Sequence, residues 1–214
     1  MTLHELRRNY TFGEMTRQSL APSPIEQFQR WFDELRQVDL PEWFESNAMV
    51  LSTAGEAAEI SSRVVLLKSL TDQGFTFFTN YRSAKAKQLD QNPRAALNFF
   101  WPMFDRQVRV EGVVSKVSPE ISDEYFQARP VRSRLGAIAS PQSAVIEDDE
   151  PLESRLEQLA SRFPDNAIPR PEHWGGYVLA PEKMEFWQGK PSRLHDRFQY
   201  QKTSEGWKIQ RLAP

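Results

Sequence analysis

The chain of 214 residues contains no cysteine, which excludes disulfides, thiolate nucleophiles and thiolate-bound zinc or iron–sulfur centres. Because nothing in it depends on an oxidising compartment, we expect a cytoplasmic protein. No apolar run approaches the roughly 20 residues of a membrane-spanning helix. The first ten residues, MTLHELRRNY, also lack the apolar core of a secretory signal. We therefore expect a soluble globular protein that does not associate with membranes.

An excess of charge of one sign is also missing, since 27 basic and 29 acidic side chains leave a net charge of −2. A nucleic-acid-binding surface usually appears as a clear basic excess, so we expect no nucleic-acid partner. The only histidines are His4, His173 and His195, which lie far apart, and we expect no metal site. The glycines form no dinucleotide or phosphate-binding loop, and neither a G-x-S-x-G nor an H-E-x-x-H motif is present.

Hydrophobic periodicity predicts a mainly β fold. Residues 1–22 are polar and irregular, and we expect a flexible N-terminal segment followed by one domain over 23–214. The apolar run 64–67 indicates a strand buried on both faces. Strands are predicted over 48–54, 60–70, 75–79, 94–101, 107–117, 176–179, 183–187, 194–200 and 207–211, and helices over 24–38, 83–91, 118–128, 131–139 and 152–163. Strands at hairpin distance with short helices between them favour an antiparallel β-barrel with peripheral helices.

A cationic cluster lies near the C-terminus. If residues 193–197 form a strand, Arg193, His195 and Arg197 share one face. Like charges on one face repel one another unless an anionic or electron-rich group lies before them. Trp187, just upstream, offers a flat surface for a planar ligand. The alternatives are a solvated barrel exterior for the cations and a core position for the tryptophan.

Two further groups of polar residues are candidates for binding a phosphate. On a helix, Tyr125 and Arg129 share a face, and with Ser133 they could donate hydrogen bonds to phosphate oxygens. The alternative is a helix end with ordinary surface arginines. Arg63 and Lys68 are five residues apart, so on a regular strand they point to opposite faces. Spacing alone therefore assigns both to one site only if the register of the strand breaks.

Several separated blocks together identify a family. They are RVVLLK at 63–68, FTN at 78–80, RQV at 106–108, YFQARP at 125–130, GG at 175–176, EFWQG at 185–189, RLHDR at 193–197 and RLAP at 211–214. In this order they resemble the pyridoxine (pyridoxamine) 5′-phosphate oxidase family over nearly the whole chain. The resemblance implies an antiparallel FMN-binding split β-barrel and a homodimer whose active sites are shared between the subunits. One position departs, because members usually have Arg-Lys where this chain has Ala84-Lys85.

The resemblance also implies roles for individual residues. It implies FMN contacts from Arg63, Val64, Val65, Leu66, Leu67, Lys68, Phe78, Thr79, Lys85, Gln107, Gln142, Ser143, Trp187 and Arg197. It implies substrate contacts from Arg7, Arg8, Asn9, Tyr10, Lys68, Tyr125, Arg129, Ser133, Arg193, Leu194 and His195. The segment from Arg7 to Tyr10 would cover the bound substrate.

The activity implied is FMN-dependent oxidation of pyridoxine 5′-phosphate or pyridoxamine 5′-phosphate to pyridoxal 5′-phosphate, with O₂ as electron acceptor and H₂O₂ as by-product. Arg197 and His195 are the candidate catalytic residues. The first would stabilise negative charge near the rings, and the second would hold or move a proton. Three alternatives stay open: another flavin split-barrel enzyme such as a reductase, a protein that stores FMN or pyridoxal phosphate without turnover, and a nucleic-acid-binding module.

Overall fold

The computed structural model describes residues 2–5, 9–11 and 13–214. In this part of the chain, nine strands form one antiparallel sheet. The strands are β1 (Ala48–Ala54), β2 (Ile60–Leu66), β3 (Ser69–Thr71), β4 (Gly74–Asn80), β5 (Arg94–Trp101), β6 (Arg106–Lys116), β7 (Trp174–Gln188), β8 (Asp196–Thr203) and β9 (Gly206–Leu212). The helices are α1 (Pro24–Leu35), α2 (Ala84–Gln91), α3 (Pro119–Ala128), α4 (Val131–Ala139) and α5 (Leu152–Arg162), with short 3-10 turns at Leu3–Glu5, Arg17–Ser19, Pro102–Phe104 and Pro191–Arg193.

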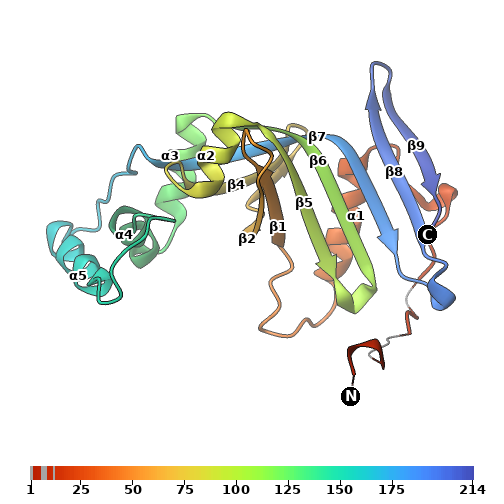
Figure 1. Ribbon diagram of the computed structural model, residues 1–214, viewed down its shortest axis with the longest axis horizontal. Coiled ribbons are helices and arrows are strands. Elements are labelled where there is room, and N and C mark those ends of the chain that lie inside the picture. Colours follow the sequence, from red (N-terminus) through yellow and green to blue (C-terminus); the bar gives the residue numbers. More distant parts are fainter. Residues whose placement is uncertain (1, 6–8, 12) are drawn as a thin grey trace.

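The sheet curls until its two ends meet. Its strand order is β2-β1-β5-β6-β7-β4-β3, and β8 and β9 extend it from β7 (Figure 1). The end strands β2 and β3 are consecutive in the chain and only Leu67 and Lys68 join them, so the ends of the sheet lie side by side. This arrangement confirms the predicted antiparallel split β-barrel with peripheral helices.

Helix α1 packs against one side of the curled sheet (Figure 1), and it contributes aromatic side chains to the core. Phe28 is fully buried and packs edge-on against Phe75, with ring centroids 5.0 Å apart, and against Phe99 at 4.8 Å. Trp31 packs in the same way on Phe186 of β7 at 5.2 Å. Removing such a buried ring costs about 3–5 kcal/mol, so these contacts hold α1 to the strands that carry the site.

Helices α3, α4 and α5 form a lobe at one end of the molecule, and β8 and β9 lie at the other end (Figure 1). Phe126, Leu135, Ile168 and Trp174 form a second buried apolar cluster between these helices and the start of β7. None of the helices in the described residues combines the length and apolar character needed to cross a membrane.

Four predictions about the strands are wrong. The predicted strand 60–70 is two strands, because β2 ends at Leu66. The two strands predicted over 176–179 and 183–187 are a single strand, β7, which lies opposite an irregularity at Glu111/Gly112 of β6. The run 64–67 is not buried on both faces. Val64 is 65% exposed because β2 is an end strand, hydrogen-bonded to β1 alone among the described strands. The run 194–200 begins its strand only at Asp196.

Candidate active site

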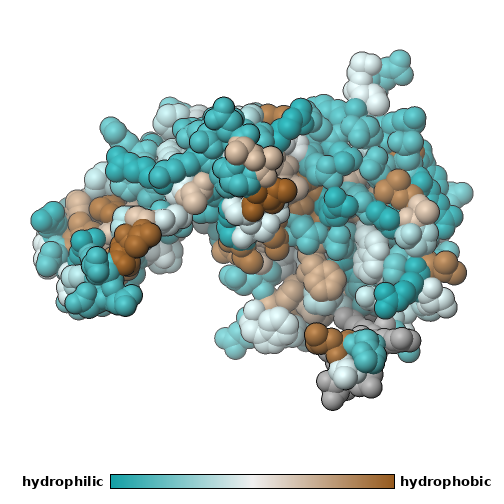
Figure 2. All heavy atoms as spheres, in the orientation of Figure 1, coloured by the Kyte–Doolittle hydropathy of each residue, from teal (hydrophilic) through white to brown (hydrophobic). Residues whose placement is uncertain are grey.

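A cation-lined cavity of about 830 Å³ opens between β2, β4 and the helices α3 and α4. The described residues that line it include Arg63, Lys68, Lys85 and Arg129 and no acidic side chain. Figure 2 shows the molecule hollowed between the α4–α5 lobe and the body of the sheet. Four cations that face one cavity without a carboxylate repel one another, and a bound anion would relieve that repulsion, so the cavity is suited to phosphate groups.

Arg63 and Lys68 reach the same cavity because the strand ends between them. Leu67 N–H donates to Asn47 O at 2.9 Å, whereas Lys68 N–H donates to Thr76 O of β4 at 2.8 Å. The chain therefore leaves its pairing beside β1 and joins β4, and the alternation of β2 stops. The side chain of Leu67 packs in the core at 7% exposed, away from the residues that line the cavity.

Lys85 is the most enclosed cation of the cavity. It lies in the first turn of α2, is 7% exposed, and its Nζ donates to Thr79 Oγ1 at 3.2 Å. Thr79 Oγ1 in turn donates to Gln142 Oε1 at 3.0 Å. Burial, and then the positive charge of Arg63, lower the pKa of Lys85. Its hydrogen-bond partners in the structure are neutral, so a phosphate would supply the missing negative charge.

Arg129 presents an unpaired donor beside a stack of aromatic rings. Tyr125 stacks on Phe78 with centroids 4.0 Å apart, and the Arg129 guanidinium lies 4.7 Å from the ring centroid of Trp174. Arg129 Nη1 is buried without a hydrogen-bond partner, and burial lowers the pKa of the guanidinium. Buried donors in native proteins are almost always paired, so an orphan of this kind indicates a ligand position. Ser133, in the first turn of α4, lines the same cavity.

The cavity thus collects most of the residues predicted for FMN and for the substrate phosphate. They are Arg63, Val64, Val65, Leu66, Lys68, Phe78, Thr79, Lys85, Tyr125, Arg129, Ser133, Gln142 and Ser143. Sequence reasoning missed Asn80, Ser140 and Trp174 as lining residues. The available sequence signal for Trp174 was the pair of glycines that follows it. A Cβ at Gly176 would lie 2.8 Å from the ring of Phe78, which also lines the cavity, so the backbone after Trp174 must pass close to the cavity wall.

A second group of predicted residues lies in one row across β6, β7 and β8. Gln107 pairs with Trp187, and Trp187 pairs with Arg197. Because directly paired residues of antiparallel strands share a face, these three side chains lie together on the sheet. The ring of His195 lies beside this row, 4.6 Å from that of Trp187 between centroids.

Arg197 is fixed in orientation and in charge. Its Nε donates to Glu185 Oε1 at 2.7 Å, and its Nη1 donates to Ala213 O at 2.8 Å. The hydrogen bond that Arg197 donates to Glu185 raises the pKa of Arg197. Glu185 also accepts from Arg109 Nη1 at 3.2 Å. The guanidinium is therefore held at both Nε and Nη1, which leaves Nη2 as the nitrogen that could donate to a ligand.

His195 is neutral and has a defined tautomer. Its Nδ1 accepts the backbone N–H of Lys190 at 3.1 Å. Since a backbone N–H only donates, Nδ1 carries no proton, and the ring carries its proton on Nε2. Burial, followed by the charges of Arg193 and Arg197, lowers the pKa of His195. The ring is thus a hydrogen-bond donor at Nε2.

The predicted alternation of Arg193, His195 and Arg197 along one strand is wrong. Residues Pro191–Arg193 form a 3-10 turn in which Ser192 and Arg193 have φ values of 57° and 60°. Strand β8 starts only at Asp196, so just Arg197 belongs to the strand face. Arg193 and Leu194 are exposed. Left-handed backbone at two adjacent non-glycine residues costs free energy and is commonest at functional sites.

Tyr10 of the N-terminal segment covers the ring of His195. Its ring packs edge-on against Trp187 at 5.6 Å and against His195 at 5.2 Å between centroids. Asn9 is exposed. The predicted contacts from Arg7 and Arg8 lie outside the described residues.

The two groups of residues are far apart within one chain. The cavity lies between β2, β4 and the helices α3 and α4, whereas Arg197 is on β8 at the opposite end of the molecule (Figure 1). Gln107, Trp187, Arg197 and His195 are not among the residues that line the cavity.

Comparisons with known proteins match this fold. Residues 34–163 match the model of the pyridoxamine 5′-phosphate oxidase family. The chain belongs to this oxidase family. Residues 174–214, which form β7, β8 and β9, match the pyridoxine 5′-phosphate oxidase C-terminal dimerisation region. The oxidase family is a family of flavin-dependent oxidoreductases.

Individual relatives are similar over their whole length. The chain is 51% identical to a pyridoxine/pyridoxamine 5′-phosphate oxidase of Bordetella pertussis, covering 100% of both chains. It is 48% identical to one of Rhodopirellula baltica, covering 99% of this chain and 96% of that one. Among solved structures, PhzG of Burkholderia lata, in complex with tetrahydrophenazine-1-carboxylic acid, has a TM-score of 0.86 at 28% identity over 95% of this chain and 99% of that one. An FMN-binding protein of Nostoc punctiforme shares the fold, with a TM-score of 0.73 at 18% identity over 91% of this chain and 100% of that one.

Proposed function

We propose that this oxidase-family protein converts pyridoxine 5′-phosphate or pyridoxamine 5′-phosphate into pyridoxal 5′-phosphate, with FMN as cofactor and O₂ as the final electron acceptor. The observation that carries the proposal is the cavity lined by Arg63, Lys68, Lys85 and Arg129 without a carboxylate. It suits two phosphorylated molecules, and relatives about half identical to this chain bear the oxidase name.

The residues present fit FMN. Arg63 and Lys85 would bind its phosphate, because Lys85 is buried with neutral partners only. Thr79 and Gln142 would add neutral hydrogen bonds beside it. When bound, FMN accepts the two electrons that leave C4′ of the substrate, chemistry that no side chain of this protein supplies.

The substrate phosphate would bind to Lys68, Tyr125, Arg129 and Ser133. Arg129 contributes its buried and otherwise unpaired Nη1, and the aromatic stack of Tyr125 and Phe78 forms the wall beside it. Holding the phosphate far from the reacting carbon uses its binding energy to orient that carbon.

His195 and Arg197 would act on the substrate ring. The neutral imidazole of His195 would donate a hydrogen bond from Nε2 to a ring oxygen, and its Nδ1 is already engaged by Lys190 N–H. Arg197 keeps its positive charge through Glu185 and would stabilise negative charge that develops nearby.

We further propose that each active site is shared by two chains. The cavity and the row of Gln107, Trp187 and Arg197 lie at opposite ends of one chain, so a second copy would supply the missing half. The match of residues 174–214 to a dimerisation region supports this arrangement, because Trp187 and Arg197 lie within it.

The test is direct. The purified protein is expected to show the absorption spectrum of bound flavin and, on addition of pyridoxine 5′-phosphate in air, to form pyridoxal 5′-phosphate and peroxide in equal amounts. Bound FMN without product would instead identify a storage protein. Oxidation of a nicotinamide cofactor without pyridoxal phosphate formation would identify a flavin reductase.

A further inference from the structure

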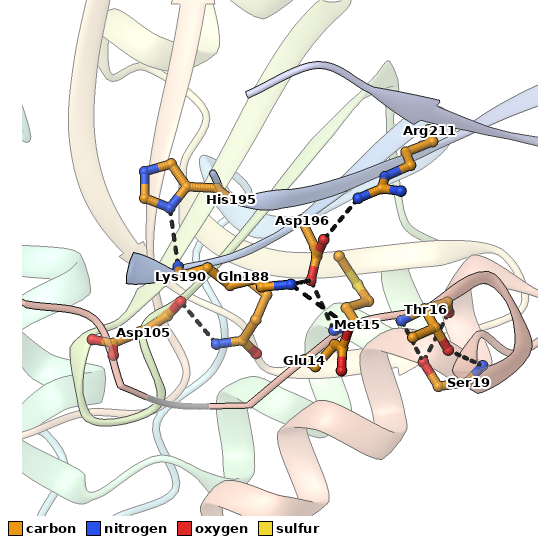
Figure 3. A network of polar contacts seen from close by, with 10 residues as sticks. All are labelled: Glu14, Met15, Thr16, Ser19, Asp105, Gln188, Lys190, His195, Asp196 and Arg211. Atoms are coloured by element: carbon orange, nitrogen blue, oxygen red, sulfur yellow. Dashed lines mark hydrogen bonds and ion pairs between the residues drawn. The ribbon is translucent and has the colours of Figure 1, made fainter. Parts of the chain in front are cut away.

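The carboxylate of Asp196 joins three parts of the chain that lie far apart in the sequence. It is 2% exposed and lies at the start of β8. Its Oδ2 accepts Met15 N–H at 3.2 Å and pairs with Lys190 Nζ at 3.1 Å, while Oδ1 pairs with Arg211 Nη2 at 3.2 Å. Figure 3 shows these contacts converging on Asp196 from the N-terminal segment, the loop before β8 and strand β9.

Asp196 is linked to the imidazole of His195 through Lys190. The side chain of Lys190 pairs with Asp196, and its backbone N–H donates to His195 Nδ1 at 3.1 Å (Figure 3). The loop around Lys190 contains the left-handed residues Ser192 and Arg193, which do not hold a conformation by local preference. The ion pair with Asp196 therefore stabilises the loop position in which His195 keeps its proton on Nε2.

Through Met15 the same carboxylate fixes the segment that carries Tyr10. Thr11 N–H donates to Asp105 Oδ2 at 3.2 Å, so residues 11 and 15 are each held by a buried aspartate. Tyr10 then lies against His195 and over Gly189, where an added Cβ would be 2.7 Å from the tyrosine ring. The sequence thus leaves room at Gly189 for Tyr10 to sit on the loop.

We propose that Asp196 is a positioning residue of the oxidation reaction: its buried carboxylate holds Tyr10 and His195 against each other by tying the N-terminal segment to loop 189–195 and to Arg211. Neither family match covers the segment that carries Tyr10 and Met15, since the matches begin at residue 34. The inference rests on the proposed function for its effect on substrate, but the anchoring of Tyr10 is measurable without substrate.

The experiment uses two variants that disturb this arrangement in different ways and one matched control. Asp196→Asn removes the negative charge at nearly constant shape, and Gly189→Ala places a methyl group against Tyr10 without changing any charge. Asp165→Asn is the control, because Asp165 also accepts a backbone N–H, from Ala167 at 3.3 Å, but lies in the loop after α5. The FMN-loaded proteins are compared by cleavage with chymotrypsin after Tyr10, followed by mass spectrometry, and by KM, kcat and flavin content.

We expect both variants to be cleaved after Tyr10 and to show a KM for pyridoxine 5′-phosphate about tenfold higher. In Asp196→Asn this is the effect of losing one charge-assisted contact, and in Gly189→Ala the added methyl group displaces Tyr10 by the same route. Both variants should keep the flavin content of the wild type. The control Asp165→Asn should match the wild type in cleavage after Tyr10, in KM and in flavin content. Wild-type cleavage and wild-type KM in Asp196→Asn would overturn the proposal. If that variant loses its flavin or unfolds, Gly189→Ala decides, and wild-type behaviour there overturns the proposal equally. If the wild type forms no pyridoxal phosphate, the proposed function fails, and the cleavage rates still decide whether Asp196 holds Tyr10.

Discussion

Heterodimers of two damaged chains test whether the cavity of one chain works with the Gln107–Trp187–Arg197 row of its partner. Arg129→Leu removes from the cavity a guanidinium whose Nη1 is buried and unpaired. Arg197→Leu removes from the row the guanidinium that donates to Glu185. A hydrogen bond to a charged group contributes about 1.5–3 kcal/mol, so each homodimeric variant should retain roughly 1–10% of the wild-type kcat/KM.

The heterodimer of these two variants should be far more active than either parent. With shared sites, one of its two sites combines the intact cavity of one chain with the intact row of the other, and the second site carries both substitutions. One intact site of two predicts about half of the wild-type activity per dimer. If each site were built within one chain, both sites would be damaged and the heterodimer would stay at the level of its parents.

The reciprocal heterodimer is the control. A wild-type chain paired with a chain that carries both Arg129→Leu and Arg197→Leu has one damaged component in each shared site, so it should be nearly inactive. Sites within single chains would instead leave it about half active. The assay is pyridoxal phosphate formation by heterodimers purified through two different affinity tags. A half-active reciprocal heterodimer together with an inactive first one would refute shared sites.

The remaining predictions concern single residues. Glu185→Gln removes the charge that raises the pKa of Arg197 and should lower kcat/KM about tenfold at unchanged flavin content, whereas Glu111→Gln, which also pairs with Arg109, should not. Because the pKa of His195 lies below its ordinary value of 6.5, the folded state binds this proton less well than the unfolded state. As pH falls below 6.5, the melting temperature and kcat/KM should therefore fall more in the wild type than in His195→Asn. Ala84→Arg places a guanidinium beside Lys85 and should tighten FMN binding about fivefold by fluorescence titration, while Gln91→Arg, at the other end of α2, should not.

Elements governed by local signals could be predicted from the sequence to the residue. Strands β1 and β5 and helix α4 have the predicted bounds 48–54, 94–101 and 131–139. Turn residues or prolines flank them, and in both strands buried positions alternate with partly buried or exposed ones. Helix α1 ends at Leu35, and not at residue 38 where the apolar spacing predicted its end. Val38 is 45% exposed, so extending the helix to this residue would bury little further apolar surface.

Features set by distant partners could not be predicted. The end of β2 depends on Lys68 N–H meeting Thr76 O, a contact that depends on the curl of the whole sheet. The turn at Ser192 and Arg193 uses left-handed backbone, for which neither residue type is a signal. Glu185, which holds Arg197, belongs to the EFWQG block, but its role appears only once β7 and β8 pair and bring the two side chains within 2.7 Å.

The same limit applies to the proposed division of the active site between two chains. The family resemblance predicts which residues belong to the site, but the pairing of the strands determines which of them lie close together within one chain. Val64 lines the cavity at 65% exposed, and Phe100, which pairs with Gln107 and so shares the face of the row, is 53% exposed. Burying either side chain against a partner would remove its apolar surface from water, which is favourable. The proposed dimer, which joins the cavity of one chain to the row of the other, predicts that both Val64 and Phe100 become buried on association, and hydrogen exchange at these two strands measured against protein concentration would check it.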